Sequence, residues 1–574
     1  MNFEEKAQSW LKSSKLSTTA RQQIEHLKTD PAVFEDAFYK DLAFGTGGLR
    51  GLMGIGSNRI NEYTVAMATQ GFANYLKEAF PNEQIKVAIA HDSRNNAKLY
   101  TRITAEVFSA NDILVYLFKE LRPTPILSFA IRTLQCHGGV VLTASHNPKE
   151  YNGYKAYWND GAQLIAPHDD QVIKNVKSIQ SIDEVKFDKK SALIKYLDDT
   201  IDRQYLDMIA SLSLSSPQKN KASNLNIVFS PIHGTGITLV PSALDKFGFE
   251  NVTVVSEQAQ PNGDFPTVIY PNPEEAEALE IALKTAKKIN ADLVLATDPD
   301  ADRVGIAVKN EKHEFELLNG NQTAALLIFY LLTKWKENGQ LKGREYIVKT
   351  IVTTELISAI AAHFKVTCLD TLTGFKYIAE KIRQLESTQT FIGGGEESYG
   401  YLIGDQVRDK DAVMSCAMIA ELTAWAKEQN KTLFDVLLDI WTEFGLYQEG
   451  LISITKKGKA GAQEIQQIMK TLRNTPPTSL NDFLVTDIID YSNLTHLETK
   501  TKNILPLDSP SSNVLQFITE DGSRISIRPS GTEPKIKIYF SVHSTLQGKS
   551  ELKEKKDQLD TQISELSKSL LKHF

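Results

Sequence analysis

The sequence predicts an α/β protein of several domains, and three observations support that prediction. Apolar, strand-like runs recur along the chain, each followed by a loop rich in glycine or charge and then by a helix-like stretch, as in VAIAHDSR, GGVVLTASHNP, LNIVFSPIHGTG, ADLVLATDPDADR and TFIGGGEESYG. This alternation is typical of repeated α/β units with functional loops at the strand ends. At 574 residues the chain is too long for one core, since domains usually hold about 100–200 residues. Its 41% hydrophobic and 24% charged residues are those of an ordinary globular protein.

Composition also excludes some partners. A net charge of −7 argues against a general nucleic-acid surface, because neutralising phosphates requires clustered Lys and Arg. The longest apolar run, Ala324–Leu332, is too short for a membrane span of about 20 residues. The first residues, MNFEEKAQSWLKSSKL, resemble neither a secretory signal nor a transit peptide. We therefore expect a cytoplasmic protein with no nucleic-acid or membrane partner. Its three cysteines are expected to be buried free thiols: they are Cys136, Cys368 and Cys416.

Polar connectors suggest where the domains divide. Ser211–Asn224, SLSLSSPQKNKASN, is rich in Ser, Asn and Lys and has no apolar period, which predicts a linker. Further breaks are predicted near Asn319, where a helix opens, and at Lys456–Gly461, KKGKAG. The predicted domains are 1–210, 211–319, 320–455 and 456–574. In the last of them, one helical face carries a stripe that we interpret as core packing: Leu552, Leu559, Ile563, Leu566 and Leu570.

The first informative loop is TASHNPKEYNGYK, which follows the apolar run GGVVL. A polar loop at the end of a buried strand is where α/β proteins usually place their chemistry, so Ser145 is a candidate nucleophile. Ser145 and Asn147 could equally be ordinary turn residues before Pro148. The loop alone leaves both interpretations open.

The second loop, TDPDADR, follows the strand-like DLVLA. Asp298, Asp300 and Asp302 offer three hard oxygen donors from alternate residues, which suits Mg²⁺. An EF-hand is excluded because Arg303 follows the third aspartate, the usual glycine is missing, and Lys309 stands where a bidentate glutamate is needed. A solvated acidic turn is the alternative, although three crowded like charges repel without a cation.

The third loop is GGGEESYG, Gly393–Gly400. Two adjacent carboxylates and a serine, flanked by glycines that let a ligand approach the backbone, suit bidentate hydrogen bonds to vicinal hydroxyls. A flexible glycine turn is the simpler alternative.

The fourth loop is RPSGTEPKIKIY, Arg528–Tyr539. Its cationic and hydroxyl side chains, with the amides of the Ser-Gly-Thr turn, could cradle a phosphate. A P-loop of the form GxxxxGK[ST] occurs nowhere in the chain, so this loop does not indicate a nucleotide. The candidate phosphate ligands are Arg528, Ser530, Thr532 and Lys535.

Together the four loops supply a metal site, a nucleophilic serine, a hydroxyl-binding loop and a phosphate cradle. With TASHNP, DPDADR, GEES and RPSGTEP in this order, the chain resembles the α-D-phosphohexomutase superfamily over nearly its whole length. FGTGGLRGLMG, SPIHGTG and GYLIGDQVRDKDAV resemble its longer phosphoglucomutase and phosphopentomutase branch. The resemblance implies an α/β fold with four domains around a central cleft. Three would be related α/β domains with mixed sheets, and the fourth a smaller C-terminal α+β domain that closes over the phosphate.

The resemblance also implies an activity. The expected reaction interconverts glucose 1-phosphate and glucose 6-phosphate, with Ser145 carried as phosphoserine and glucose 1,6-bisphosphate as intermediate and activator. Mg²⁺ would be held by Asp298, Asp300, Asp302 and the phosphoserine oxygen. The expected partner is a small phosphosugar, and the expected state is a monomer or homodimer.

Other site residues follow from the same resemblance. Lys155 and Lys376 are the candidate bases, and which serves which half-reaction stays open. Arg50 would lie beside the phosphoserine, and His146 would orient it, with a purely structural histidine as the alternative. Asp92 and Arg94 are expected to brace the serine loop. The expected substrate-binding residues are Arg303, Gly374, Glu396, Glu397, Ser398, Arg528, Ser530, Gly531, Thr532 and Lys535.

Three alternatives remain at this stage. A phosphopentomutase or a glucose-1,6-bisphosphate synthase would carry almost the same loops. A Mg²⁺-dependent phosphatase with Asp298 as nucleophile would leave TASHNP, GEES and RPSGTEP unexplained. A catalytically silent phosphosugar sensor is disfavoured because every expected catalytic position is filled.

Overall fold

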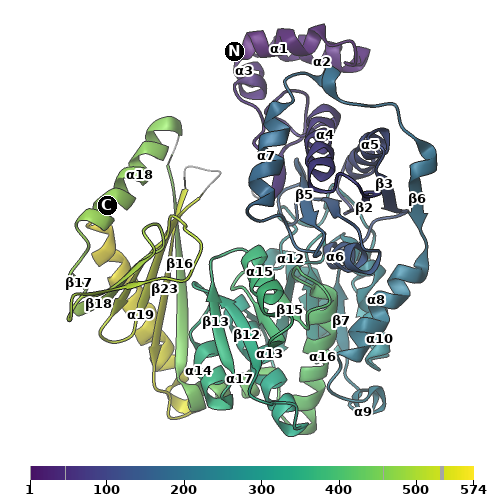
Figure 1. Cartoon of the computed structure of the whole chain (residues 1–574). Coiled ribbons are helices and arrows are strands. Elements are labelled where there is room, and N and C mark those ends of the chain that lie inside the picture. Colours follow the sequence, from purple (N-terminus) through teal and green to yellow (C-terminus); the bar gives the residue numbers. More distant parts are fainter. Residues whose placement is uncertain (1, 46, 457, 531–534) are drawn as a thin grey trace.

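Four β-sheets follow one another along the chain, each with its own helices (Figure 1). The structure is a computed structural model that describes residues 2–45, 47–456, 458–530 and 535–574. The first three sheets mix parallel and antiparallel pairs, whereas the fourth is antiparallel throughout. The predicted α/β fold class is confirmed.

The first unit begins with three helices that share a small apolar core: α1 (Phe3–Lys12), α2 (Thr18–Leu27) and α3 (Pro31–Phe38). A six-stranded sheet follows in the order β1-β5-β4-β2-β3-β6. Its strands are β1 (Gly48–Leu52), β2 (Lys86–His91), β3 (Leu114–Phe118), β4 (Gly138–Leu142), β5 (Tyr151–Trp158) and β6 (Ile194–Leu197). Its helices are α4 (Glu62–Ala79), α5 (Ala97–Ala110), α6 (Thr124–Thr133) and α7 (His168–Ser178), with short 3₁₀ turns η1 (Ile182–Glu184) and η2 (Ser191–Leu193).

The strand order of this sheet places a ligand site. The chain leaves β2 toward β3 on one side and returns to β4 on the other, so the connections diverge at the parallel pair β2 and β4. Ligands of open α/β sheets bind at such a switch point, outside the carboxyl ends of the strands. The AHDSR and TASHNP loops leave β2 and β4 at this point.

The second unit holds a five-stranded sheet in the order β11-β10-β9-β7-β8. Its strands are β7 (Ile227–Ser230), β8 (Val252–Val254), β9 (Leu293–Thr297), β10 (Val304–Lys309) and β11 (Phe315–Leu318). Its helical segments are α8 (Asp199–Ser211), α9 (Pro217–Ala222), η3 (Thr235–Thr238), α10 (Val240–Lys246), α11 (Ser256–Ala259) and α12 (Ala276–Ile289). The β9 run LVLAT is buried on both faces, and the loop to β10 carries the aspartates.

The connector predicted at Ser211–Asn224 is not an irregular linker. Ser216 accepts a hydrogen bond from the Lys219 amide and Pro217 occupies the first turn, so the segment starts the short helix α9. The Asn220 side chain is buried and donates to the Phe247 carbonyl at 2.9 Å. Polar composition suggested a solvated linker, but capping and this buried amide fix the segment against the second unit.

The third unit has a four-stranded sheet in the order β13-β12-β14-β15. Its strands are β12 (Glu345–Thr350), β13 (Thr367–Thr371), β14 (Thr390–Gly395) and β15 (Tyr401–Ile403). Its helices are α13 (Gly320–Glu337), α14 (Leu356–Phe364), α15 (Phe375–Leu385), α16 (Ala412–Glu428) and α17 (Leu433–Phe444). Asn319 caps α13, where the sequence predicted a new helix.

The fourth unit is the antiparallel sheet β16-β23-β22-β21-β18-β19-β20, with β17 paired to β18. It starts at Leu446, ahead of the predicted boundary between 455 and 456. The strands are β16 (Leu446–Thr455), β17 (Ser479–Leu480), β18 (Phe483–Asp490), β19 (Thr495–Glu498), β20 (Asn503–Pro506), β21 (Leu515–Thr519), β22 (Arg524–Pro529) and β23 (Lys535–Ser544). The helices are α18 (Gly458–Asn474) and α19 (Leu552–Leu571), with η4 (Lys549–Glu551) between β23 and α19. The predicted leucine stripe of α19 packs into the core, as expected.

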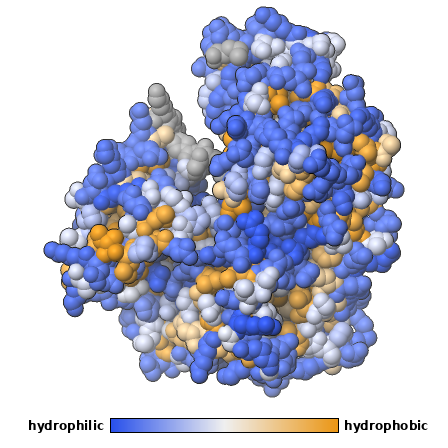
Figure 2. Space-filling view, in the orientation of Figure 1, coloured by the Kyte–Doolittle hydropathy of each residue, from blue (hydrophilic) through white to orange (hydrophobic). Residues whose placement is uncertain are grey.

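Figure 2 shows the surface hollowed between the fourth unit and the first, with mostly hydrophilic side chains on the visible walls. Within the described part of the chain, no helix is long and apolar enough to cross a membrane. The three cysteines are unpaired, and all are at least partly buried, as predicted.

Candidate active site

Ser145 lies in the loop between β4 and β5, at the switch point of the first sheet. Its backbone has a φ of 51°, in the left-handed region that non-glycine residues seldom adopt. The Ser145 hydroxyl donates to Asp298 Oδ2 at 2.7 Å. This bond brings together two loops from different sheets, so the turn around Ser145 presents the serine directly to the aspartates.

A buried network holds the serine loop in this conformation. The Ser145 amide donates to Thr143 Oγ1 at 2.8 Å, and the Thr143 hydroxyl donates to Asp92 Oδ2 at 2.7 Å. Arg94 lies 3.4 Å from the same carboxylate and donates to the Ser145 carbonyl at 2.6 Å. The predicted bracing role of Asp92 and Arg94 is confirmed, since Arg94 also donates to the carbonyls of Asn147, Pro148 and Tyr151.

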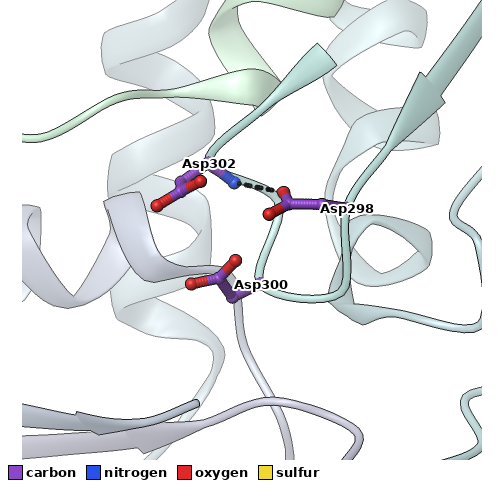
Figure 3. A group of neighbouring side chains, drawn as sticks. All are labelled: Asp298, Asp300 and Asp302. Atoms are coloured by element: carbon purple, nitrogen blue, oxygen red, sulfur yellow. Dashed lines mark hydrogen bonds between the residues drawn. The ribbon is translucent and has the colours of Figure 1, made fainter. Parts of the chain in front are cut away.

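Asp298, Asp300 and Asp302 converge in the β9–β10 loop (Figure 3). One carboxylate oxygen from each lies within 4.8 Å of the others, and all three side chains are buried. The Asp302 amide donates to Asp298 Oδ1 at 3.1 Å, which tightens the turn. Asp300 Oδ1 and Asp302 Oδ1 are buried without a hydrogen-bond partner, a costly state for carboxylate oxygens. A compact set of hard oxygens with two free acceptors fits Mg²⁺.

Two lysines supply the positive charge next to these aspartates. Lys155 on β5 donates to Asp300 Oδ2 at 2.6 Å and to Asp302 Oδ2 at 2.9 Å. Lys410 lies 3.0 Å from Asp302 Oδ2 and 3.0 Å from Asp409 Oδ1. Sequence reasoning predicted Lys155 but missed Lys410, whose only signal was the charged run RDKD just before α16.

The charge pattern separates the three aspartates. Burial, and then the neighbouring carboxylate of Asp300, raises the pKa of Asp298 well above its usual value. Burial also acts to raise the pKa of Asp302, but the ammonium groups of Lys155 and Lys410 outweigh it and lower that pKa. The serine therefore faces an aspartate whose pKa is raised, whereas the pKa of Asp302 is lowered.

Thr124 is a second contact that sequence reasoning missed. At the start of α6, its hydroxyl donates to Asp300 Oδ2 at 2.9 Å and its amide donates to the Asp300 carbonyl at 2.8 Å. No local motif marked this threonine. It ties the first unit to the aspartate loop of the second.

Three other predicted side chains flank the serine and the aspartates. His146 Nδ1 lies 3.1 Å from the serine Oγ. Arg50 on β1 donates to Asn147 Oδ1 at 3.2 Å, in the same loop. Arg303 forms an ion pair with Glu274, a partner that sequence reasoning did not identify. His146, Arg50 and Arg303 therefore all lie next to the loops that carry Ser145 and the three aspartates.

The hydroxyl-binding loop follows β14. The buried carboxylate of Glu396 accepts a hydrogen bond from the Gly374 amide at 2.8 Å, which joins two predicted substrate residues. Glu397 accepts from Thr350 and Thr353, each at 3.3 Å. Ser398 lies in the same loop, half-buried.

Lys376 is placed differently from Lys155. It lies in the first turn of α15, with its ammonium 3.6 Å from the buried Asp169 on α7. Burial lowers the pKa of Lys376, against the opposing influence of Asp169. Lys376 therefore bridges the third and first units, and no hydrogen bond or ion pair joins it to the aspartate cluster within the described residues.

The predicted phosphate loop belongs to the fourth unit. Arg528 lies on β22 and Lys535 starts β23, and the Ser530 amide donates to the Lys535 carbonyl at 2.7 Å. Gly531 and Thr532 lie outside the residues that the structure describes. Lys537 on β23 faces the third unit, where its charge interacts with Glu397.

Comparison with known proteins matches this arrangement domain by domain. The phosphoglucomutase/phosphomannomutase models match the chain with alpha/beta/alpha domain I at residues 41–183, domain II at 203–312, domain III at 319–444 and the C-terminal domain at 455–557.

Relatives and solved structures of the same family also match this chain over most of its length. A phosphoglucomutase of Staphylococcus haemolyticus is 37% identical over 515 residues, which cover 89% of this chain and 92% of the relative. Parafusin from Paramecium, a phosphoglucomutase in its open form, superposes with a TM-score of 0.66 at 19% identity, covering 93% of this chain and 96% of that one. A structure described as a putative phosphomannomutase from Thermus thermophilus gives 0.65 at 21% identity, covering 88% and 96%. The chain belongs to the phosphoglucomutase/phosphomannomutase family.

Proposed function

We propose that this protein is a phosphoglucomutase that interconverts glucose 1-phosphate and glucose 6-phosphate through a phosphoserine at Ser145 and glucose 1,6-bisphosphate. The observation that carries the proposal is the 2.7 Å hydrogen bond from the Ser145 hydroxyl to Asp298, inside a cluster of three buried aspartates. The relatives named phosphoglucomutase, 37% identical over most of the chain, support the same activity.

In the first half-reaction, a hydroxyl oxygen of the sugar phosphate attacks the phosphorus of phosphoserine 145. The bond from phosphorus to Ser145 Oγ breaks, and the proton lost by the sugar hydroxyl is delivered, through a base, to the serine oxygen. The bisphosphate then turns around, and Ser145 Oγ attacks its other phosphate by the reverse steps. Atoms balance, because one phosphoryl group leaves the serine and one returns.

The chain's own residues prepare the serine for this exchange. Asp298 accepts the hydrogen bond of the free serine hydroxyl, and the brace of Thr143 and Arg94 fixes the backbone that carries it. Lys155 and Lys410 place two positive charges beside the aspartates. Asp298, Asp300 and Asp302 would hold Mg²⁺, which when bound supplies positive charge to the oxygens of the transferred phosphoryl group.

The base is assigned to Lys155 or Lys376, as the sequence suggested. Lys155 is held by two carboxylates, whereas Lys376 has a single acidic partner at 3.6 Å and a pKa lowered by burial. A lysine with a lowered pKa is the better proton acceptor near neutral pH. These contacts favour Lys376 as the base, once substrate displaces Asp169.

Sugar and distal phosphate would be held by loops from the third and fourth units. The carboxylates of Glu396 and Glu397, with Ser398, would bind vicinal hydroxyls, and Gly374 keeps Glu396 in place. The loop from Arg528 to Lys535, with Ser530, Gly531 and Thr532, would hold the phosphate that is not being transferred. Both orientations of the bisphosphate present a phosphate to this same loop.

Phosphorus NMR tests the proposal. The purified protein is incubated with Mg²⁺, a trace of glucose 1,6-bisphosphate and, separately, glucose 1-phosphate, mannose 1-phosphate or ribose 1-phosphate. We expect glucose 1-phosphate to react fastest. Ser145→Ala should abolish the reaction, and Ser178→Ala, at an exposed serine of α7, should leave it unchanged.

Other outcomes contradict specific parts of the proposal. Faster conversion of ribose 1-phosphate would identify a phosphopentomutase that uses the same residues. Net accumulation of glucose 1,6-bisphosphate from a phosphoryl donor would identify a bisphosphate synthase. Release of inorganic phosphate that persists in Ser145→Ala would reject the serine mechanism in favour of Asp298 as nucleophile.

A further inference from the structure

A cavity outside the proposed active site lies in the first unit, on the side of β2 away from β4. Its volume is about 310 Å³, at the lower end of the range of about 300–1,000 Å³ typical of small-molecule sites. Residues of α5, β3, η2 and β6 line it together with the last residue of β2. The apolar part of its wall comes from Ala105, Leu117, Phe118 and Ile194.

Four positively charged side chains surround this cavity, which we call the α5 cavity. Two of them are neutralised locally, because Lys98 pairs with Glu120 at 2.9 Å and Lys189 pairs with Glu106 at 3.2 Å. The other two, Arg102 and Lys119, are exposed and have no ion pair with any described residue.

The net positive charge of the α5 cavity is thus available to a ligand. Two cations without an ion pair suit a phosphate group, which accepts charge-assisted hydrogen bonds from both. The lining carboxylate of Glu106 is held by Lys189.

The wall also contains two buried polar side chains that keep spare hydrogen-bonding capacity. Thr101 is 4% exposed, yet its hydroxyl has no hydrogen-bond partner. In a helix a threonine hydroxyl can bond the carbonyl one turn earlier, as Thr104 does on this same helix. His91, 3% exposed, also lines the cavity, and its Nδ1 lies 2.7 Å from the Asp92 carbonyl, which leaves Nε2 for another partner.

We propose that the α5 cavity binds a nucleoside monophosphate. Arg102 and Lys119 would bind the phosphate at the rim. The aromatic ring of Tyr196, which is 67% exposed at the mouth, offers a face for the base. The buried hydroxyl of Thr101 and the ring of His91 would bind the ribose hydroxyls.

The α5 cavity is separate from the phosphosugar site. His91 precedes Asp92, and Asp92 with Thr143 stands between the cavity and Ser145. A ligand in the α5 cavity therefore reaches none of the loops proposed to bind the sugar phosphate. Binding should persist when the active site is saturated.

Isothermal titration calorimetry of the full chain with adenosine 5′-monophosphate tests the proposal. Titrations are run with and without a saturating equilibrium mixture of glucose 1-phosphate and glucose 6-phosphate. We expect one site per chain in both conditions, and weak competition by the phosphate groups of the sugars should raise the Kd by less than about tenfold. Inorganic phosphate should bind the same site at least about tenfold more weakly, because it lacks the ring and hydroxyl contacts.

Variants distinguish a built site from general attraction of anions. The double variant R102E/K119E should weaken binding of adenosine 5′-monophosphate by more than about tenfold. The matched control K553E/K568E changes the charge equally, at exposed lysines of α19, and should bind as the wild type does.

Thr101→Val should weaken binding by about two- to tenfold, the loss of one neutral hydrogen bond. It should not lower the Tm of the free protein and can raise it, because the buried hydroxyl has no partner to lose. The absence of saturable binding, equal loss in K553E/K568E, equal affinity for inorganic phosphate, or complete displacement by the phosphosugar mixture would each overturn the proposal.

Discussion

Replacing Thr143 by valine should separate the bracing of the serine loop from its chemistry. Valine has nearly the same shape, so Thr143→Val removes two hydrogen bonds without opening a cavity: the 2.8 Å bond from the Ser145 amide and the 2.7 Å bond to Asp92. Thr143 is 1% exposed, so water cannot replace either bond. Each unsatisfied buried group costs about 1–3 kcal/mol. The left-handed backbone of Ser145 stores about 1 kcal/mol, which favours relaxation of the loop once the brace is gone.

The two groups together predict a loss of about 2–6 kcal/mol, divided between global stability and local relaxation of the loop. We expect a lower Tm and a fall in kcat of at least about 10²-fold with little change in KM, because the mispositioned serine affects the transfer more than substrate binding. Thermal unfolding measures the Tm, and a coupled assay of glucose 6-phosphate formation measures kcat and KM.

The control for this prediction is Thr104→Val on α5. Thr104 is equally buried, but its hydroxyl donates only to the Tyr100 carbonyl, within the helix. We expect less than about 1 kcal/mol of destabilisation and an unchanged kcat. If Thr143→Val lowers the Tm but keeps wild-type kcat, the serine loop does not depend on this brace and the reasoning is wrong.

Three further predictions concern charge and metal. Lys410→Met leaves the buried carboxylates of Asp302 and Asp409 without their shared cation. We therefore expect about 3–5 kcal/mol of destabilisation in urea unfolding and a large loss of kcat. Near-normal stability and kcat would show that Lys155 alone balances the charge of the aspartates. Removing divalent cations with EDTA should abolish turnover, and adding Mg²⁺ back should restore it and raise the Tm; activity that survives chelation contradicts a metal site. Burial raises the pKa of Glu449 from 4.5 to about 7, so the folded state keeps a proton that the unfolded state releases, and stability falls as pH rises through this window. Glu449→Gln should therefore be more stable than the wild type by about 3 kcal/mol at pH 8 and equal to it near pH 4 in urea unfolding. An equal difference at both pH values would reject the shifted pKa.

The sequence was most informative where chemistry is local. The run GGVVL predicted the buried strand β4, and three aspartates on alternate residues predicted a cation site, because each inference needs only a few neighbouring residues. The stripe on α19 was predictable for the same reason, since helical periodicity is a local property.

Long-range pairing could not be predicted in this way. Lys410 and Asp409 sit in a run of alternating charge that is typical of a solvated loop, and only the packing of the third unit against the first buries them. Asp169 resembled an ordinary acidic residue at a helix start, yet it is buried against Lys376. These contacts join residues from separate sheets, which spacing along the chain cannot reveal.

The contacts between units differ in a way that matches the proposed reaction. The serine and the aspartates come from the first and second units, which Thr124, Lys155 and Ser145 join by buried hydrogen bonds. The fourth unit meets the third mainly through apolar side chains, because the large core continues from α17 into the fourth sheet and a smaller cluster adds to it. Polar contacts are also present, among them Gln516 to the Ile351 carbonyl at 3.2 Å. In the proposed mechanism, the phosphoryl group is transferred at the polar junction of the first two units, while the loop for the other phosphate belongs to the fourth unit. A bisphosphate that must turn around needs this division, because the transfer geometry has to persist while the loop that holds the other phosphate releases and rebinds.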